Sequence, residues 1–182
     1  MKKKYLNLSQ LILPVLVLGL LMQGCKTQDK LIKDFSGNYL PDNFFFRAIG
    51  QGTDADMLRA KTKAVFYAKA EIAGNARSFC EKIILDYVDQ TGNKDNIDLK
   101  NRFISVSQES VSVSMTNVIV EDVTYKKEKD NQYTCYAKVK VEKGNVLEAF
   151  VDRSKNLLSN VNSTLLKQIG DEEANQTNSK RK

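Results

Sequence analysis

Three cysteines are the residues of this chain best suited to chemistry, and each lies in a different context. Cys25 directly follows Gly24 and an apolar run, whereas Cys80 and Cys135 fall in segments with regular hydrophobic patterns. The sequence contains no histidine and no Cys-x-x-Cys pair, which excludes histidine-based catalytic triads, imidazole metal ligands and dithiol redox motifs. The cysteines are therefore expected to serve attachment or packing.

The first 24 residues have the layout of an export signal. Three lysines at positions 2–4 precede twelve uncharged residues, 11–22. A membrane-spanning helix needs roughly 17–25 apolar residues, so this run is too short to cross a bilayer. A basic start, a short apolar stretch and a small residue at the cut, here Gly24, are typical of a secretory signal peptide. The sequence therefore predicts that residues 1–24 are removed.

The residues around Cys25 resemble the lipobox of bacterial lipoproteins. Gly24 and Cys25 match with Leu21 upstream, while Met22 and Gln23 depart from the strictest form of the pattern. The resemblance implies that the Cys25 sulfur receives a diacylglyceryl group and that the new amine receives another acyl chain, such as palmitate. Two or more chains anchor a protein stably where one does not. The alternative is an ordinary signal peptide cut near Gly24, which would leave Cys25 as a free thiol.

The residue after this cysteine bears on location. In enteric-type bacteria an aspartate there resembles an inner-membrane retention signal, and this chain has Lys26 instead. We therefore expect a lipid-anchored outer-membrane protein that faces the periplasm or the cell surface.

Length and charge predict one domain without a nucleic-acid partner. Removing 24 of the 182 residues leaves 158, which suits one domain. Without the three lysines of the signal, 25 basic residues stand against 22 acidic ones, and a net charge of +3 is no nucleic-acid signal. Residues 25–42 are predicted to be a lipidated tether, residues 43–170 a single α+β domain and residues 171–182 a disordered tail.

An aromatic strand and a long helix are predicted to open this domain. Residues 43–51 alternate around phenylalanines and run into Gly50 and Gly52, which predicts a strand with a tight glycine turn after it. Thr53 and Asp56 have the spacing of a capping box, and apolar residues recur at helical steps over 54–89. The inner stripe is alanine-rich, which favours close packing on a sheet. The outer face is basic, and we expect it to be solvated or to meet anionic headgroups (Arg59, Lys63, Lys69, Arg77 and Lys82).

The pattern Gly50-x-Gly52-x-x-Ala55 also fits the dinucleotide-binding fingerprint. In that fingerprint a phosphate sits at the start of the helix, where Asp54 and Asp56 would repel it. We therefore expect no cofactor here.

Three further strands are predicted after residue 100. Apolar residues alternate with serines between Ile104 and Met115, with a break of phase at residues 108–109. Residues 118–127 and Tyr133 to Glu142 form two more alternating runs, joined by turn residues into a hairpin. Together with the first strand they predict a mostly antiparallel four-stranded sheet with the long helix on one face.

A C-terminal helix is predicted over residues 145–169, packed on the sheet or on a partner, with Gly170 just past its end. Cys80 lies beside the core stripe of the long helix and Cys135 on the core face of the last strand, so the two could form a disulfide. Buried free thiols are the alternative.

The domain resembles the Lpp-twenty family of bacterial envelope lipoproteins, over roughly residues 43–143. The resemblance implies a strand-helix-strand-strand fold and, in some members, assembly into multimers at the outer membrane. The C-terminal helix is not part of the family core. The matching residues are Ala48-Ile49-Gly50-Gln51-Gly52, the helix alanines Ala60, Ala64, Ala68 and Ala76, Asn117-Val118, Val120, Asp122-Val123, and Tyr133, Tyr136, Ala137 and Val139.

No enzyme, cofactor or metal site is predicted, because the paired carboxylates have structural explanations: Asp54 with Asp56 at a helix start, Glu121 with Asp122 on a strand, and a pair in the tail. Two functions remain open. The first is a non-catalytic structural or protein-interaction module that binds envelope proteins or itself. Its surface would be the polar sheet face or the apolar C-terminal helix (Tyr136, Lys138, Lys140; Val151, Leu158, Leu165). The second is a lipoprotein that binds a small molecule or glycan through tyrosines and phenylalanines at the sheet edge.

Overall fold

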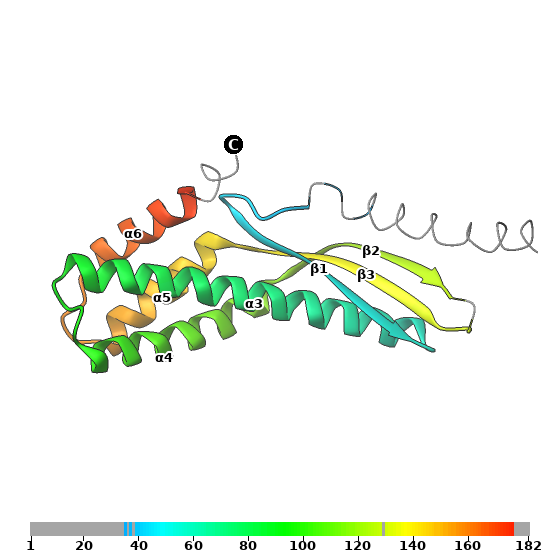
Figure 1. Ribbon diagram of the computed structural model, residues 1–182, viewed down its shortest axis with the longest axis horizontal. Helices are drawn as coiled ribbons and strands as arrows, with labels where there is room; N and C mark the ends of the chain where they lie inside the picture. The colour runs from blue at the N-terminus through cyan, green and yellow to red at the C-terminus, as the bar shows by residue number, and fades with distance from the viewer. Residues whose placement is uncertain (1–34, 36, 38, 129, 177–182) are drawn as a thin grey trace, which may run out of the picture. The chain divides into compact units, whose positions relative to one another are not determined.

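The computed structural model describes residues 35, 37, 39–128 and 130–176, so Cys25, the predicted signal peptide and most of the predicted tether lie outside the described residues. The described residues from Tyr39 onward form one compact unit. The strands are β1 (Phe45–Asp54), β2 (Ile119–Lys127) and β3 (Tyr133–Glu142). The helices are α3 (Met57–Gln90), α4 (Ile97–Ser114), α5 (Lys143–Leu157) and α6 (Ser163–Gln176), with a short 3-10 turn at Met115–Asn117. The fold is α+β, as predicted (Figure 1).

The sheet is antiparallel, and β3 lies between β1 and β2. The hairpin of the last two strands and the bounds of β3 agree with the sequence pattern. Ala48 pairs with Val139, and both are buried on the face that α3 covers. Arg47 pairs with Lys140 on the opposite face. The alternation of apolar and polar residues therefore predicted correctly which face of the sheet is covered.

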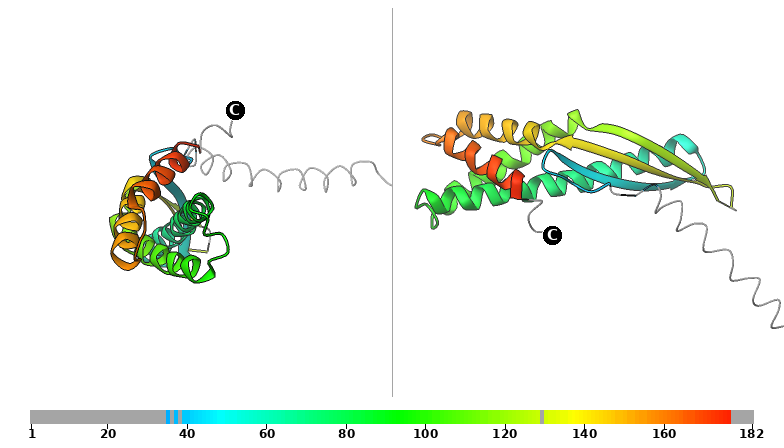
Figure 2. Two further views of the ribbon diagram at one scale, coloured as in Figure 1. Left: turned by 90° about the vertical axis from the view of Figure 1, so that its left-hand side faces the viewer. Right: turned by 90° about the horizontal axis from the view of Figure 1, so that it is seen from above.

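Helix α3 has two different sets of neighbours along its length. Its first half lies on β1 and β3, and its second half packs against α4 and α6 (Figure 1, Figure 2). Where α3 meets β1, a Cβ on Gly50 would lie 1.9 Å from the Ala64 carbonyl oxygen, and one on Gly52 would lie 2.4 Å from the Ala60 oxygen. Both glycines lie inside β1, so the prediction of a glycine turn was wrong. They are required because the strand and helix backbones are almost in contact.

The second half of α3 packs through large side chains. Phe103 of α4 is fully buried between Tyr87 of α3 and Phe150 of α5, with ring centroids 5.4 Å and 6.1 Å away. Leu166 of α6 is also fully buried. This helical end of the unit therefore holds its own aromatic and aliphatic core, continuous with the one beneath the sheet.

The prediction of a strand between Ile104 and Met115 was wrong, because this segment is the second half of α4. Consequently, the sheet of the described residues has three strands and not four. The serines were interpreted as the exposed, polar side of a strand. Ser110 and Ser114 instead lie on the buried face of the helix, where each hydroxyl donates to the carbonyl four residues back. A serine whose hydroxyl is hydrogen-bonded to its own helix in this way can be buried like a small apolar residue.

The single predicted C-terminal helix is two helices, α5 and α6. The helix is interrupted by a loop at residues 158–162. In this loop Asn160 has a positive φ of 67°, and the Asn162 side chain accepts a hydrogen bond from the Leu165 amide. Gly170 lies inside α6 and not past a helix end, and a Cβ there would lie 2.2 Å from the Leu147 side chain. Residues 171–176 of the predicted tail are helical, and residues 177–182 lie outside the described residues.

Candidate functional site

The sheet face opposite α3 carries the residues that the sequence suggested as a binding surface. Lys140 pairs with Arg47, Lys138 with Ile49, and Tyr136 with Gln51, so the three predicted residues lie in one row along β3. Tyr136 is only 6% exposed, which makes it a packing residue and not a contact for a partner. Lys138 and Lys140 are partly exposed.

Aromatic rings hold the cations of this face in place. The guanidinium of Arg47 lies 5.7 Å from the centroid of Tyr39 and 5.3 Å from that of Phe45. The Lys138 amine lies 5.3 Å from the Tyr39 ring, and the Lys140 amine 4.6 Å from the Phe45 ring. Sequence analysis missed this stack because it placed Tyr39 in the tether. Phe45 and Arg47 share one face of the first strand, and Lys138 and Lys140 share one face of the last strand. This pattern of an aromatic ring and cations on one sheet face was the signal that could have predicted the stack.

Two carboxylates pair with cations of this stack. Asp42 pairs with Arg47 at 2.6 Å, and Glu121 pairs with Lys140. Glu121 is the extra residue at a bulge between Val120 and Asp122, and a bulge re-aims the side chain at this point. Because two of its three cations already pair with carboxylates, this face is a structural feature of the fold and a poor site for binding an ion.

These contacts also shift the pKa of the groups involved. Burial alone would raise the pKa of both acids, but other contacts outweigh it and lower them: hydrogen bonds from the Phe44 and Phe45 amides and from Arg47 to Asp42, and the paired Lys140 amine beside Glu121. Burial raises the pKa of Tyr39 well above its usual range, and the neighbouring Glu121 carboxylate adds to this rise. Both acids are therefore held in the charged form.

The outer edge of β2 is a different kind of surface. Helix α3 contacts β1 and β3 extensively and β2 only slightly. Ile119, Val120 and Tyr125 of this strand are exposed. The Val123 amide of this strand donates to the Asp122 carboxylate at 2.8 Å. An edge strand with exposed apolar side chains can accept another strand.

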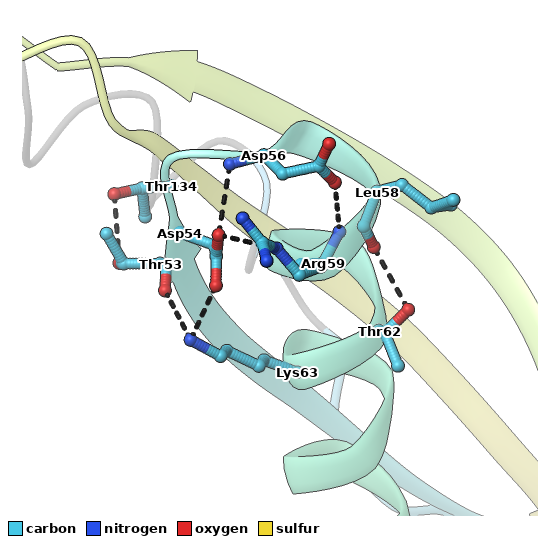
Figure 3. A network of polar contacts seen from close by, with 8 residues as sticks. All are labelled: Thr53, Asp54, Asp56, Leu58, Arg59, Thr62, Lys63 and Thr134. Atoms are coloured by element: carbon cyan, nitrogen blue, oxygen red, sulfur yellow. Dashed lines mark hydrogen bonds and ion pairs between the residues drawn. The ribbon is translucent and has the colours of Figure 1, made fainter.

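The start of α3 is fixed by a polar network (Figure 3). Asp56 is the N-cap and accepts from the Arg59 amide at 2.8 Å, so the prediction that Thr53 caps the helix was wrong. Thr53 still belongs to β1, and its hydroxyl lies 3.2 Å from that of Thr134. Asp54 accepts from the Asp56 amide and pairs with Arg59 at 3.0 Å and Lys63 at 2.8 Å. The Lys63 hydrogen bond and the Asp56 amide lower the pKa of Asp54 to about 2.

Cys80 and Cys135 are free thiols, so the structure does not contain the suggested disulfide. Cys135 pairs with Gly52, which lies on Ala60 and Ala64, and Cys80 lies sixteen residues beyond Ala64 on α3. That separation is about 24 Å along the helix, far beyond the reach of a disulfide. Burial raises the pKa of Cys80 to about 12, with Glu81 adding to it, and burial also raises that of Cys135. Neither thiol is suited to act as a nucleophile.

A hollow of about 420 Å³ lies where β1 begins, between the start of α5 and the end of α6. Its apolar lining includes Phe44, Phe45 and Leu147, and its polar lining includes Asn43 and Asp171. The volume falls in the range of small-molecule sites.

In the part of the chain that the structure describes, no group of three or more histidine, cysteine or acidic residues is arranged to hold a metal ion. Likewise, none of the helices described is both long and apolar enough to cross a membrane.

Comparisons with protein-family models, with curated proteins and with solved structures found no match for this chain.

Proposed function

We propose that this protein is a lipid-anchored envelope protein, attached through Cys25, that acts as a non-catalytic protein-interaction module. The observation that carries the interaction proposal is the exposed outer edge of β2, with Ile119, Val120 and Tyr125 uncovered beside it. The lipid anchor is supported by the sequence around Cys25, which resembles a lipobox, and remains the expectation drawn from it.

The β2 edge favours a protein partner because it supplies both parts of strand addition. The outward backbone groups give hydrogen bonds, and the exposed side chains give apolar contacts. The partner would be a second copy of this chain or another envelope protein with a free strand. The C-terminal helices are no longer candidates for this role, because Val151 and Leu158 are buried in the core of the fold.

The anchor is tested by labelling cells with radioactive palmitate. The full chain should incorporate label, and the Cys25→Ser variant should not. Equal labelling of the two chains, or none in either, would contradict the anchor and leave the interaction proposal to its own test.

The interaction is tested by formaldehyde crosslinking of intact cells that express the full chain. We expect a crosslinked species of discrete mass that is lost when Val120→Lys and Tyr125→Lys are combined, because buried lysines oppose strand addition. The matched control is Leu85→Lys, an exposed apolar residue on α3 away from this edge. A parent chain without crosslinked species, or equal crosslinking in the edge variant, would sink the proposal.

A second candidate function, binding of a small molecule or glycan, is favoured by the hollow at the start of β1. Its phenylalanines offer faces for stacking on a sugar or an apolar ligand, and Asn43, Asp171 and Asn175 offer hydrogen bonds. A Cβ on Gly144, at the rim, would meet no atom within 4 Å. Gly144→Phe should therefore fill the hollow without unfolding the chain. A rise in Tm with sugars or small metabolites that this variant abolishes would support this function.

A further inference from the structure

The two halves of α3 differ sharply in charge. Met57–Ala70 contains four basic side chains and no acidic one: Arg59, Lys61, Lys63 and Lys69. Residues 71–90 contain two basic and four acidic side chains. The positive charge therefore gathers on the half of the helix that lies on the sheet.

The same half exposes large apolar side chains. Leu58 is 68% exposed, Phe66 65% and Tyr67 57%. Leu58, Thr62 and Phe66 follow one another at four-residue steps, so they form one line along the helix. This line lies opposite the buried stripe of alanines that packs on β1, so neither the sheet nor another helix of the unit covers it.

The lysines and aromatic rings of this surface are arranged together. The rings of Phe66 and Tyr67 meet edge to face, with centroids 5.7 Å apart. Asp54 draws Arg59 and Lys63 toward the start of the helix (Figure 3). Lys61 and Lys69 have no ion-pair partner among the described residues. Counting Asp54 and Asp56, the surface keeps two positive charges in excess.

We propose that this surface of α3, formed by Leu58, Arg59, Lys61, Thr62, Phe66, Tyr67 and Lys69, docks on a bilayer that contains anionic phospholipids. A helix surface that combines aromatic and aliphatic side chains with lysine and arginine is suited to the boundary between headgroups and acyl chains. The rings and Leu58 would enter this boundary, while the long basic side chains reach back to phosphate groups. A second half of opposite charge would keep the rest of α3 off the surface.

A fluorescent label on α3 tests this docking with the full chain. The background is Cys25→Ser, so the test does not depend on the lipid anchor. Thr62→Cys or Ser78→Cys then adds one exposed thiol, on the first or the second half of α3. Cys80 and Cys135 are buried with raised pKa values, so they should not react in the folded chain. Each chain is labelled with a polarity-sensitive dye and mixed with phosphatidylcholine vesicles, with or without phosphatidylglycerol.

We expect the emission of the label at position 62 to shift to shorter wavelength with phosphatidylglycerol vesicles only, and the label at position 78 to stay unchanged. Because both labels are on the same helix, binding through the N-terminal residues alone would not produce this difference. Raised salt should reverse the shift, since exposed charges are screened. Equal shifts at both positions, no shift at position 62, or an equal shift with phosphatidylcholine alone would overturn the proposal.

Two variants of the position-62 chain sharpen the test. Phe66→Ser with Tyr67→Ser should abolish the shift, and so should Lys61→Glu with Lys69→Glu. All four side chains lie outside the buried core, so the fold should persist, as circular dichroism would verify. Leu85→Ser is the matched control, because this exposed residue lies on the second half, and it should leave the shift intact. A shift that survives both variants would contradict the proposal.

Discussion

The two halves of α3 are packed by opposite means. In the first half, Ala60, Ala64 and Ala68 lie directly on a strand that has glycine at two positions, so the layers touch through their backbones. In the second half, large side chains fill the space between the layers: the Phe79 ring lies 5.6 Å from that of Phe46 in β1, and the Tyr87 ring lies 5.4 Å from that of Phe103 in α4. One continuous helix thus joins two regions. In the first, small residues let the backbones approach closely, and in the second, large side chains fill the core.

This difference teaches which substitutions each region tolerates. A packed aromatic core loses contacts when a side chain is shortened. A backbone-to-backbone contact instead fails when a single carbon is added. The exposed surfaces differ as well: the first half of α3 carries Leu58, Phe66 and Tyr67 outward beside lysines, whereas the second half exposes Leu85 among acidic residues.

The largest expected effect is in the aromatic core. Phe103→Ala should lower the free energy of unfolding by about 3–5 kcal/mol, because it leaves a cavity between Tyr87 and Phe150. Chemical denaturation measures the loss. Ile97→Ala on the same helix removes an exposed side chain and should change stability by less than about 0.5 kcal/mol. Equal effects of the two variants would mean that α4 does not pack here.

The next effect tests the contact between strand and helix. Gly50→Ala should cost about 3 kcal/mol, at the upper end for overpacking, because its Cβ would lie 1.9 Å from a backbone oxygen of Ala64 that has little room to move. The comparison is Gly144→Ala, where the new Cβ meets nothing within 4 Å. Thermal unfolding of both variants is the measurement. A Gly50→Ala chain as stable as the parent would refute the close approach.

A smaller effect concerns the link between α3 and the break before α6. The Tyr87 hydroxyl accepts from the Asn162 amide at 2.9 Å. Tyr87→Phe should cost about 1–2 kcal/mol, because it leaves this amide without its partner. Tyr67→Phe, on the exposed surface, is the control and should be neutral. Hydrogen exchange should also become faster at Asn162 in the first variant alone.

A dependence on pH is expected at the start of α3. The pKa of Asp54 is lowered to about 2 from an ordinary value of 3.8. A carboxylate with a depressed pKa stabilises the fold above its unfolded value, and this stability is lost as pH falls from about 4 toward 2. The parent should therefore lose more stability than Asp54→Asn over this range in acid titrations followed by circular dichroism. Parallel curves would show that the contacts of Asp54 with Lys63 and Arg59 contribute nothing to the stability of the fold.

The smallest effect has the opposite sign. Gly74 lies in the middle of α3, exposed, with nothing within 4 Å of an added Cβ. Gly74→Ala should therefore stabilise the chain by about 0.5–1 kcal/mol, because alanine loses less conformational freedom in a helix. A rise in Tm checks this. A fall in Tm would mean that the close packing that excludes a Cβ in the first half of α3 extends past Ala68.

Sequence patterns were reliable where one physical requirement set them. The strict alternation from Tyr133 to Glu142 predicted β3 and its two faces, because a central strand covered on one side needs it. The alanine stripe predicted that α3 lies close to a sheet. The pattern around α4 failed because serines, which read as the polar half of a strand, are satisfied inside a helix by the chain's own carbonyls.

The candidate surfaces could be predicted only in part. Lys138 and Lys140 were correctly placed on one sheet face, but their partners Tyr39 and Phe45 come from segments distant in sequence. That β2 is an edge strand could not be predicted, because the strand order depends on which strand of the β2–β3 hairpin pairs with β1. The basic, exposed character of the first half of α3 was visible from its residue types alone.

By itself, the sequence determined the periodicities: which strands alternate, and which helix face is small and which is basic. These properties are local, since they follow from the spacing of side chains along one element. Only the tertiary structure decided that Gly50 and Gly52 meet a helix backbone, that Cys80 and Cys135 lie far apart, and that β2 lies at an edge of the sheet. Those outcomes depend on distances between elements, which no single stretch of the chain specifies.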